Sequence, residues 1–181
     1  MHMKILGIVG STRKGSYNRG LMNAFIEHKP EGVEMEVVEI GTLPLFDQDV
    51  EASAFPETAQ ALKDQIANAD AVIIATPEYN RGMPGVLKNA IDWASRPYGK
   101  NSFAGKTVYV VGASVGPIAT AVSQYNVKQV MLYLDAHVIG QPEFYVGLAG
   151  EKFDAEGTLT DASTKEHIVG AWKVIAERAG K

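Results

Sequence analysis

A regular alternation of short apolar runs with longer helical patterns is the feature that most limits how this chain can fold. The apolar runs are Ile5–Val9, Met35–Ile40, Ala71–Ala75, Thr107–Val111 and His137–Ile139, and their β-branched content is typical of buried strands. The helical patterns are Tyr17–His28, Glu57–Asn68, Pro84–Ser95, Ala119–Leu134 and Thr164–Ala179. This alternation predicts an α/β protein, with a parallel sheet covered by helices.

The expected sheet also predicts where a ligand binds. Open sheets of five parallel strands commonly have the strand order 2-1-3-4-5, and a ligand then lies outside the carboxyl ends of strands 1 and 3, where the order reverses. The chain has 181 residues without a repeat or a linker, so we expect one domain over residues 1–181. The loops after the first, third and fourth runs are therefore the candidate site.

The loop after the first run has the composition of a phosphate-binding loop. Residues 10–18 read Gly-Ser-Thr-Arg-Lys-Gly-Ser-Tyr-Asn, and the helical pattern begins at Tyr17. A strand, a small polar loop and a helix N-terminus aim backbone N–H groups at an anion. Ser11 and Ser16 add hydroxyl donors, Arg13 adds a fixed positive charge, and Ser16 also suits the N-cap position. The alternative is an ordinary strand-to-helix turn with a capping serine.

Two common nucleotide-binding motifs do not fit this loop. Gly15 is followed by Ser16 and Tyr17, where a Walker motif requires Lys and then Ser or Thr. Gly7 and Gly10 do not have the spacing of the dinucleotide fingerprint. The loop therefore suits a single phosphate monoester that needs no metal ion.

The loop after the third run, residues 76–84, combines rigid and adaptable positions. Pro77 fixes one backbone angle and cannot continue a strand ladder, whereas Gly82 allows unusual backbone angles. Such a loop can present its N–H and C=O groups to a planar heterocycle, and Tyr79 and Asn80 can add stacking and hydrogen bonds. A surface turn with a half-buried tyrosine is the alternative.

The loop after the fourth run raises a different possibility. Residues 112–117 read Gly-Ala-Ser-Val-Gly-Pro, which matches the Gly-x-Ser-x-Gly pattern of a hydrolase nucleophile. The remaining members of a triad would be His167 and one of Asp135, Asp154 and Asp161. Pro117 is an awkward start for the tight helix that such a nucleophile needs, so we favour a loop that lies close to the same heterocycle.

Composition excludes several other classes of function. A net charge of −4 gives no general affinity for nucleic acid or anionic membranes. The absence of cysteine excludes disulfides and thiolate catalysis. His28, His137 and His167 lack the spacing of metal ligands, so no metal site is expected. No apolar run approaches the length of a membrane span, and we expect a cytoplasmic protein.

Three loop motifs together resemble the NADPH-dependent FMN reductase family, and within it the bacterial quinone and chromate reductases. The motifs are Gly10–Asn18, the Pro77-Glu-Tyr-Asn80 tetrapeptide and Pro84–Trp93. The resemblance implies a flavodoxin-like three-layer sandwich, bound FMN, and a homodimer or homotetramer. It implies that Ser11, Arg13, Ser16, Tyr17 and Asn18 hold the FMN phosphate, that Pro77, Glu78, Tyr79 and Asn80 line the isoalloxazine ring, and that Ser114 and Gly116 lie on the other side of the ring.

The same resemblance implies the chemistry. Hydride would pass from NADPH or NADH to flavin N5, and then in ping-pong fashion to a quinone, chromate, azo or flavin acceptor. The cofactor carries this reaction, so no catalytic side chain is required, and Glu78 is assigned to a pocket rim or subunit interface. Family members often have further glycines after the fourth strand, where this chain has Pro117, Ile118 and Ala119. This difference affects both the flavin contact and the approach of the nicotinamide.

Two further expectations concern partners. A non-enzymatic electron carrier of the flavodoxin type would share the fold and FMN, although such carriers are usually more acidic than this chain.

The residues Val130–Leu134 are apolar on every side of their expected helix, and Trp93 ends another helix. Because a helix that packs on a sheet needs only one apolar face, this surplus favours packing against a second subunit, with burial beneath a loop of the chain as the alternative.

Overall fold

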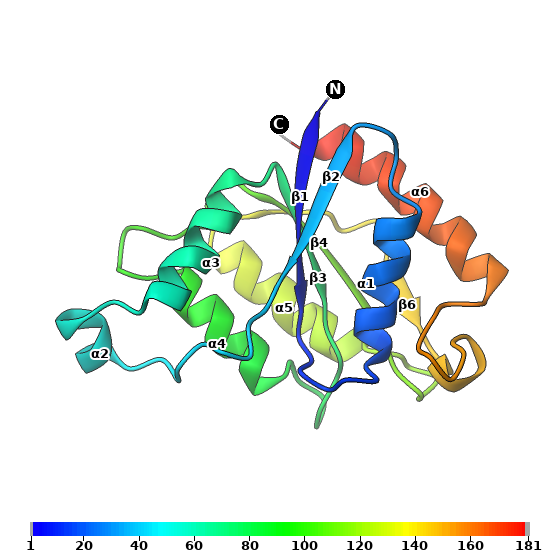
Figure 1. Cartoon of the computed structure of the whole chain (residues 1–181), viewed down its shortest axis with the longest axis horizontal. Helices are drawn as coiled ribbons and strands as arrows, with labels where there is room; N and C mark the ends of the chain where they lie inside the picture. Colours follow the sequence, from blue (N-terminus) through cyan, green and yellow to red (C-terminus); the bar gives the residue numbers. More distant parts are fainter. Residues whose placement is uncertain (1, 180–181) are drawn as a thin grey trace.

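The computed structural model describes residues 2–179, which form a parallel sheet with helices on both faces (Figure 1). The strands are β1 (Met3–Val9), β2 (Val33–Val38), β3 (Ala71–Ala75), β4 (Thr107–Ala113), β5 (His137–Val138) and β6 (Phe144–Val146). The helices are α1 (Tyr17–Glu27), α2 (Gln48–Ser53), α3 (Glu57–Asn68), α4 (Gly85–Ala94), α5 (Ala121–Tyr133) and α6 (Ala162–Arg178), with a short 3-10 helix η1 (Ala149–Glu151).

The strand order is β2-β1-β3-β4-β5, and every pairing is parallel. The central strands are in close register, since Ile5 pairs with Ala71 and Ala71 pairs with Thr107. All side chains of β3 and β4 are buried, which explains their continuous apolar runs in the sequence. The predicted flavodoxin-like arrangement and its strand order are therefore confirmed.

Two apolar layers hold the helices against the sheet. On one face, Phe25 of α1 and Trp172 of α6 are almost completely buried, with ring centroids 5.9 Å apart. On the other face, α3, α4 and α5 contribute Leu62, Leu87 and Val127 to a separate core cluster. The sheet therefore lies between two helical layers, as the alternating sequence predicts.

The fifth strand position differs from the prediction, because two short strands share it. β5 pairs with the beginning of β4, whereas β6 pairs with its end, from Val111 to Ala113. The residues between β5 and β6 include Pro142, which has no N–H for a strand ladder. The Tyr109 hydroxyl donates a hydrogen bond of 2.8 Å to the Pro142 carbonyl oxygen and anchors this connection to β4.

Residues 41–56 form a segment that crosses the outside of α4 and includes the unpredicted helix α2 (Figure 1). Trp93 of α4 is buried beneath this segment, and its indole N–H donates a hydrogen bond of 2.8 Å to the Pro44 carbonyl oxygen. Phe46 and Phe55 pack edge-on against the Trp93 ring. The chain itself therefore covers Trp93, so for this residue the alternative of burial beneath a loop is confirmed.

The last helix begins where the sequence provides a capping side chain. The Asp161 carboxylate accepts a hydrogen bond of 2.8 Å from the Thr164 backbone N–H and one of 2.6 Å from the Thr164 hydroxyl. These bonds hold the pKa of the Asp161 carboxyl below its ordinary value. Within residues 2–179, no helix has both the length and the apolar composition needed to cross a membrane.

Candidate functional site

The loops after β1, β3 and β4 meet at one edge of the sheet, because parallel strands end on the same side (Figure 1). A Cβ atom added to Gly10, at the end of β1, would lie 3.3 Å from Cδ of Pro77. A Cβ atom added to Gly112 in β4 would lie 2.4 Å from the carbonyl oxygen of Thr76. The three loops therefore touch one another at the position where the strand order reverses.

The loop after β1 is open to an anion. Among residues 2–179, no protein acceptor lies within hydrogen-bond distance of the backbone N–H groups of Lys14, Gly15 and Ser16. The hydroxyl of Ser16 caps α1, where it accepts a bond of 3.4 Å from the Arg19 backbone N–H. The first turn of α1 contains no acidic residue. A helix N-terminus with unpaired N–H groups and no acid of its own suits a phosphate.

The other residues expected at this loop differ in exposure and contacts. Ser11 is nearly buried, whereas Arg13 is exposed and holds its guanidinium 5.8 Å from the centre of the Tyr17 ring. The Tyr17 ring packs on Phe153, with ring centroids 5.3 Å apart. The side-chain amide of Asn18 hydrogen-bonds to the backbone of β4. Asn18 can therefore offer a ligand its backbone N–H but not its side chain.

The loop after β3 contains a tight hairpin turn. Tyr79 and Gly82 exchange two backbone hydrogen bonds, of 3.1 and 3.0 Å, and form an isolated antiparallel bridge. Asn80 and Arg81 lie between them with φ angles of 51° and 61°. Two consecutive residues in the left-handed region are typical of a type I′ turn, and asparagine tolerates this region better than most residues. Pro77 is buried at the base of the loop, and Tyr79 is exposed at its tip.

Glu78 connects this loop to α5. Its side chain is only 6% exposed, and one carboxylate oxygen accepts a hydrogen bond of 3.1 Å from the Ser123 backbone N–H in the first turn of α5. The other carboxylate oxygen accepts a bond of 3.0 Å from the Arg81 guanidinium. Both oxygens of Glu78 are therefore used within the protein, where they fix the turn relative to α5.

A cavity of about 370 Å³ lies between the loops after β3 and β4. Its lining residues are Glu78, Asn80, Arg81, Ser114, Val115, Gly116, Pro117, Ile118 and Ala119. The structure thus brings together four residues that the sequence assigned to the flavin ring, namely Glu78, Asn80, Ser114 and Gly116. Sequence reasoning did not assign Val115 to the site and named Ile118 only as a difference from the family, although both follow Ser114 in the same loop.

The surroundings of Ser114 do not form a hydrolase nucleophile. The Ser114 hydroxyl accepts a hydrogen bond of 3.2 Å from the Gly116 backbone N–H, and α5 begins only at Ala121. A nucleophile elbow instead places its serine directly at a strand-to-helix turn. His167 lies on α6 beside a different hollow. Among residues 2–179, no hydrogen bond joins Ser114 to a histidine or an aspartate.

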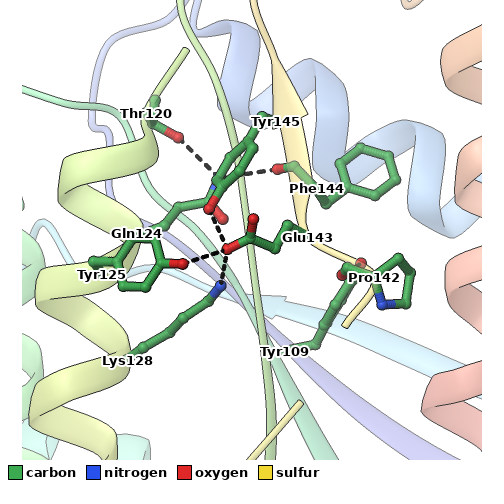
Figure 2. Close-up of polar contacts among 9 residues, drawn as sticks. All are labelled: Tyr109, Thr120, Gln124, Tyr125, Lys128, Pro142, Glu143, Phe144 and Tyr145. Atoms are coloured by element: carbon green, nitrogen blue, oxygen red, sulfur yellow. Dashed lines mark hydrogen bonds and ion pairs between the residues drawn. The ribbon is translucent and has the colours of Figure 1, made fainter. Parts of the chain in front are cut away.

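A second polar cluster, which the sequence did not indicate, lies between α5 and β6 (Figure 2). One oxygen of the Glu143 carboxylate accepts bonds of 2.6 Å from the Tyr145 hydroxyl and 2.9 Å from the Tyr125 hydroxyl. The Lys128 ammonium lies 3.4 Å from the same oxygen. The hydrogen bond from Tyr145, followed by the one from Tyr125, holds the pKa of the Glu143 carboxyl below its ordinary value. Burial is the main cause that raises the pKa of the Tyr145 phenol.

Gln124 lies next to this cluster, on the same helix as Tyr125 (Figure 2). Its buried amide nitrogen donates bonds of 3.0 Å to the Thr120 hydroxyl and 2.9 Å to the Phe144 carbonyl oxygen, and so ties α5 to β6. Within residues 2–179, no group of three or more histidine, aspartate and glutamate residues is arranged to hold a metal ion. The chemistry that these loops favour is therefore binding of an anionic group beside a flat, partly apolar pocket.

An open α/β sheet with unpaired N–H groups at the start of the first helix and a cavity at its switch point is typical of mononucleotide-binding proteins of the flavodoxin-like class. The chain belongs to the NADPH-dependent FMN reductase family, whose model matches residues 3–151. This membership confirms the expected class of enzyme, an oxidoreductase that uses FMN and a nicotinamide donor.

Individual relatives agree with the family assignment. The chain is 45% identical to a 2-hydroxy-1,4-benzoquinone reductase of a Burkholderia species over 168 residues, which cover 93% of this chain and 91% of that protein. It is 39% identical to a quinone reductase of Escherichia coli K12 over 178 residues, which cover 97% of this chain and 94% of that protein. The solved structure of FerB, a flavoenzyme NAD(P)H:(acceptor) oxidoreductase from Paracoccus denitrificans, matches with a TM-score of 0.89 at 39% identity, covering 97% of this chain and 96% of FerB.

Proposed function

We propose that this protein is an NAD(P)H:quinone oxidoreductase that binds FMN across the loops after β1, β3 and β4. The observation that carries the proposal is the open N-terminus of α1, whose loop N–H groups lack protein acceptors within the described chain, at the same edge of the sheet as the loops that line the 370 Å³ cavity. A phosphate fits the first feature, and a flat ring fits the second. FMN combines both groups in one molecule.

The proposal gives each loop residue a task. Ser11, Arg13, Ser16, Tyr17 and Asn18 hold the phosphate, Tyr17 and Asn18 through their backbone N–H groups. Pro77, Glu78, Tyr79 and Asn80 form the rigid turn on one side of the ring, and Ser114 and Gly116 lie on the other side. When bound, FMN supplies a two-electron carrier that reacts in turn with the nicotinamide and with the acceptor. The side chains position both substrates and restrict water, and none of them has to move a proton.

The walls of the cavity support a planar, carbonyl-bearing acceptor. Val115 is 65% exposed and Ile118 is 54% exposed, so both offer apolar surface to a ring. Arg81 adds a guanidinium that can donate hydrogen bonds to carbonyl or phenolate oxygens. The names of the Burkholderia and Escherichia relatives support a quinone as this acceptor. Chromate, azo compounds and free flavin belong to the same proposal as further acceptors.

The test is the visible absorption spectrum of the purified protein after incubation with FMN and desalting. We expect retained flavin that NADPH or NADH bleaches anaerobically and that a benzoquinone then restores. Retained flavin that resists both donors would favour the electron-carrier alternative. If desalting removes all flavin, the proposal is wrong.

We propose further that the enzyme is a homodimer or a homotetramer, with α5 in the interface. Val122, Tyr125, Leu132 and Tyr133 are exposed apolar residues of α5, and Tyr133 is 84% exposed. A hollow of about 800 Å³ runs between α4 and α5 beside Val130 and Tyr133. Exposed apolar patches of this kind are typical of subunit interfaces.

Size-exclusion chromatography with light scattering tests the interface. We expect an oligomer that Leu132→Glu converts to monomers, because a charge would be buried at the contact. Val169→Glu, which places the same charge on exposed apolar surface of α6, is the control. A wild-type monomer would overturn this part of the proposal.

We propose, in addition, a single domain over residues 1–181 and a cytoplasmic location, the latter supported by the nicotinamide donor of the family.

A further inference from the structure

Asn18 joins the two halves of the proposed flavin site. It is the second residue of α1 and is only 3% exposed. Its amide nitrogen donates a hydrogen bond of 3.0 Å to the carbonyl oxygen of Ala113, and its amide oxygen accepts one of 2.9 Å from the N–H of the same residue. Ala113 is the last residue of β4, 95 positions away in the sequence.

The sequence neighbours of Asn18 and Ala113 belong to two different parts of the proposed site. Asn18 directly follows Ser16 and Tyr17, at the open N-terminus of α1. Ala113 directly precedes Ser114, which lines the cavity. One side chain therefore connects the start of α1 to the loop after β4 that lines the cavity.

Only an amide side chain of this length fits the contact. A primary amide carries a donor and an acceptor side by side, so it can pair with the N–H and the C=O of one backbone residue. Aspartate lacks the donor and would place an oxygen against the Ala113 carbonyl, and alanine would leave both backbone groups without their partner. With both atoms used in this way, the side chain of Asn18 is not free to hold a phosphate.

We propose that Asn18 is a positioning residue that sets the distance between the phosphate loop and the ring loop through Ala113, and is not itself a ligand side chain. The inference rests on the proposed binding of FMN. FMN is one molecule with two recognised ends, so it gains affinity when both anchors are held at a fixed separation. If the anchors shift relative to each other, this gain falls even though each end is recognised as before.

Separate probes for each end can therefore detect the role. Riboflavin occupies the ring position without a phosphate, and inorganic phosphate occupies the loop without a ring. A positioning role affects FMN far more than either probe. A ligand role of the Asn18 side chain would weaken inorganic phosphate as well.

The chain offers a matched control in Asn89 of α4. Asn89 is 8% exposed, its oxygen accepts a bond of 2.8 Å from the Phe46 N–H, and its nitrogen donates one of 2.8 Å to the Pro44 carbonyl oxygen. The chemistry and the burial match those of Asn18, but this contact holds residues 41–56 and does not line the cavity. Asn89→Ala therefore reports the general cost of removing such a bridge.

The experiment compares Asn18→Ala and Asn89→Ala as flavin-free proteins. Fluorescence quenching measures the dissociation constants of FMN and riboflavin, and competition measures that of inorganic phosphate. In Asn18→Ala we expect the FMN constant to rise about 10-fold, with riboflavin and phosphate changed less than about 3-fold. In Asn89→Ala we expect all three constants to stay within about 2-fold of wild type.

Three outcomes would overturn the inference: an unchanged FMN constant in Asn18→Ala, an equal loss of phosphate affinity, or an equal loss of FMN affinity in Asn89→Ala. A wild-type protein that binds riboflavin and phosphate but not FMN would contradict the fixed separation alone. A wild-type protein that binds none of them would overturn the proposed function as well.

A measurement on the wild type covers the case in which Asn18→Ala does not fold. We expect the Ala113 amide and the Asn18 side-chain amide protons to exchange slowly with solvent, both without ligand and with FMN bound. NMR hydrogen exchange records these protons individually. If FMN releases the Ala113 amide, or if the Asn18 side-chain protons couple to the phosphorus of FMN, the side chain is a ligand and the inference is wrong.

Discussion

The N-termini of α1 and α5 lie at the same edge of the sheet, but only that of α5 receives a carboxylate from the protein. α5 receives the buried carboxylate of Glu78, which accepts a hydrogen bond from the Ser123 N–H. α1 has only the Ser16 hydroxyl as a cap and no acid in its first turn. Since every helix N-terminus carries a partial positive charge, α5 is compensated within the chain and α1 is left for an anionic ligand.

This difference explains why the two ends of one ligand would bind near different helices along the same edge of the sheet. A phosphate gains most at α1, because no protein carboxylate competes for its N–H groups. At the α5 side the Ser123 N–H is already occupied by Glu78, and the loops present the rigid Asn80–Arg81 turn and apolar side chains to a ligand instead. The proposed site therefore places the ring of a flavin toward α5 and its phosphate toward α1.

The largest predicted effect comes from making α1 resemble α5. Ser16→Asp keeps a good N-cap but places a carboxylate where the phosphate should bind. We expect the dissociation constant of FMN to rise about 100-fold, because two like charges would share one site, while the free energy of unfolding of the flavin-free protein stays within about 0.5 kcal/mol. Fluorescence titration and urea unfolding measure the two quantities.

Ser163→Asp is the control for this change, since it adds the same charge in the first turn of α6, outside the cavity. It should leave FMN affinity within about 2-fold of wild type. Unchanged FMN affinity in Ser16→Asp would show that the phosphate does not bind at α1.

A smaller effect is expected when α1 loses its nearby cation. Arg13→Ala should raise the dissociation constant of FMN about 10-fold and leave that of riboflavin unchanged, because only FMN carries the phosphate. Arg19→Ala removes an equal charge from α1, but Arg19 already pairs with Glu39 at 2.7 Å. If both variants weaken FMN equally, general charge and not a contact of Arg13 is responsible.

Removing the charge from α5 tests the other half of the comparison. Glu78→Gln keeps the shape of the side chain but weakens its bonds to Ser123 and Arg81, so we expect a loss of about 1 kcal/mol in the free energy of unfolding. Turnover per bound flavin should stay near the wild-type value. Glu39→Gln is the exposed control. Loss of turnover with flavin and assembly intact would mean that Glu78 takes part in the chemistry.

The smallest effect concerns α6, whose N-terminus is capped by a protein carboxylate, as that of α5 is. The pKa of Asp161 lies below its ordinary value of 3.8, first because of the hydrogen bonds from Thr164, so its stabilisation is complete at neutral pH and is lost as the pH falls through the lowered pKa. We expect Asp161→Asn to lower the melting temperature slightly near pH 7, with a difference that shrinks below about pH 4. A difference independent of pH would mean that the charge of Asp161 does not contribute.

The sequence predicted the parts of the fold that depend on local pattern. The strand runs, the helices within a few residues, and the loop from Gly10 to Asn18 all follow from periodicity and loop composition. The family resemblance named residues around the cavity, of which Glu78, Asn80, Ser114 and Gly116 line it.

What the sequence did not predict depends on contacts between distant segments. Nothing near Glu78 indicates that Ser123 is its partner, and nothing near Asn18 indicates Ala113. For Trp93 the sequence left two possibilities open, because an apolar helix end looks alike under a loop and at a subunit interface, and only the structure shows that residues 41–56 cover it.

A crystal structure of the protein with FMN tests the central claim most directly. The account predicts that the phosphate lies within hydrogen-bond distance of the Ser16 hydroxyl and of the backbone N–H groups at the start of α1, with the ring beside Asn80 and Ser114. A phosphate bound near Glu78 at the N-terminus of α5, or a flavin bound outside this edge of the sheet, would contradict it.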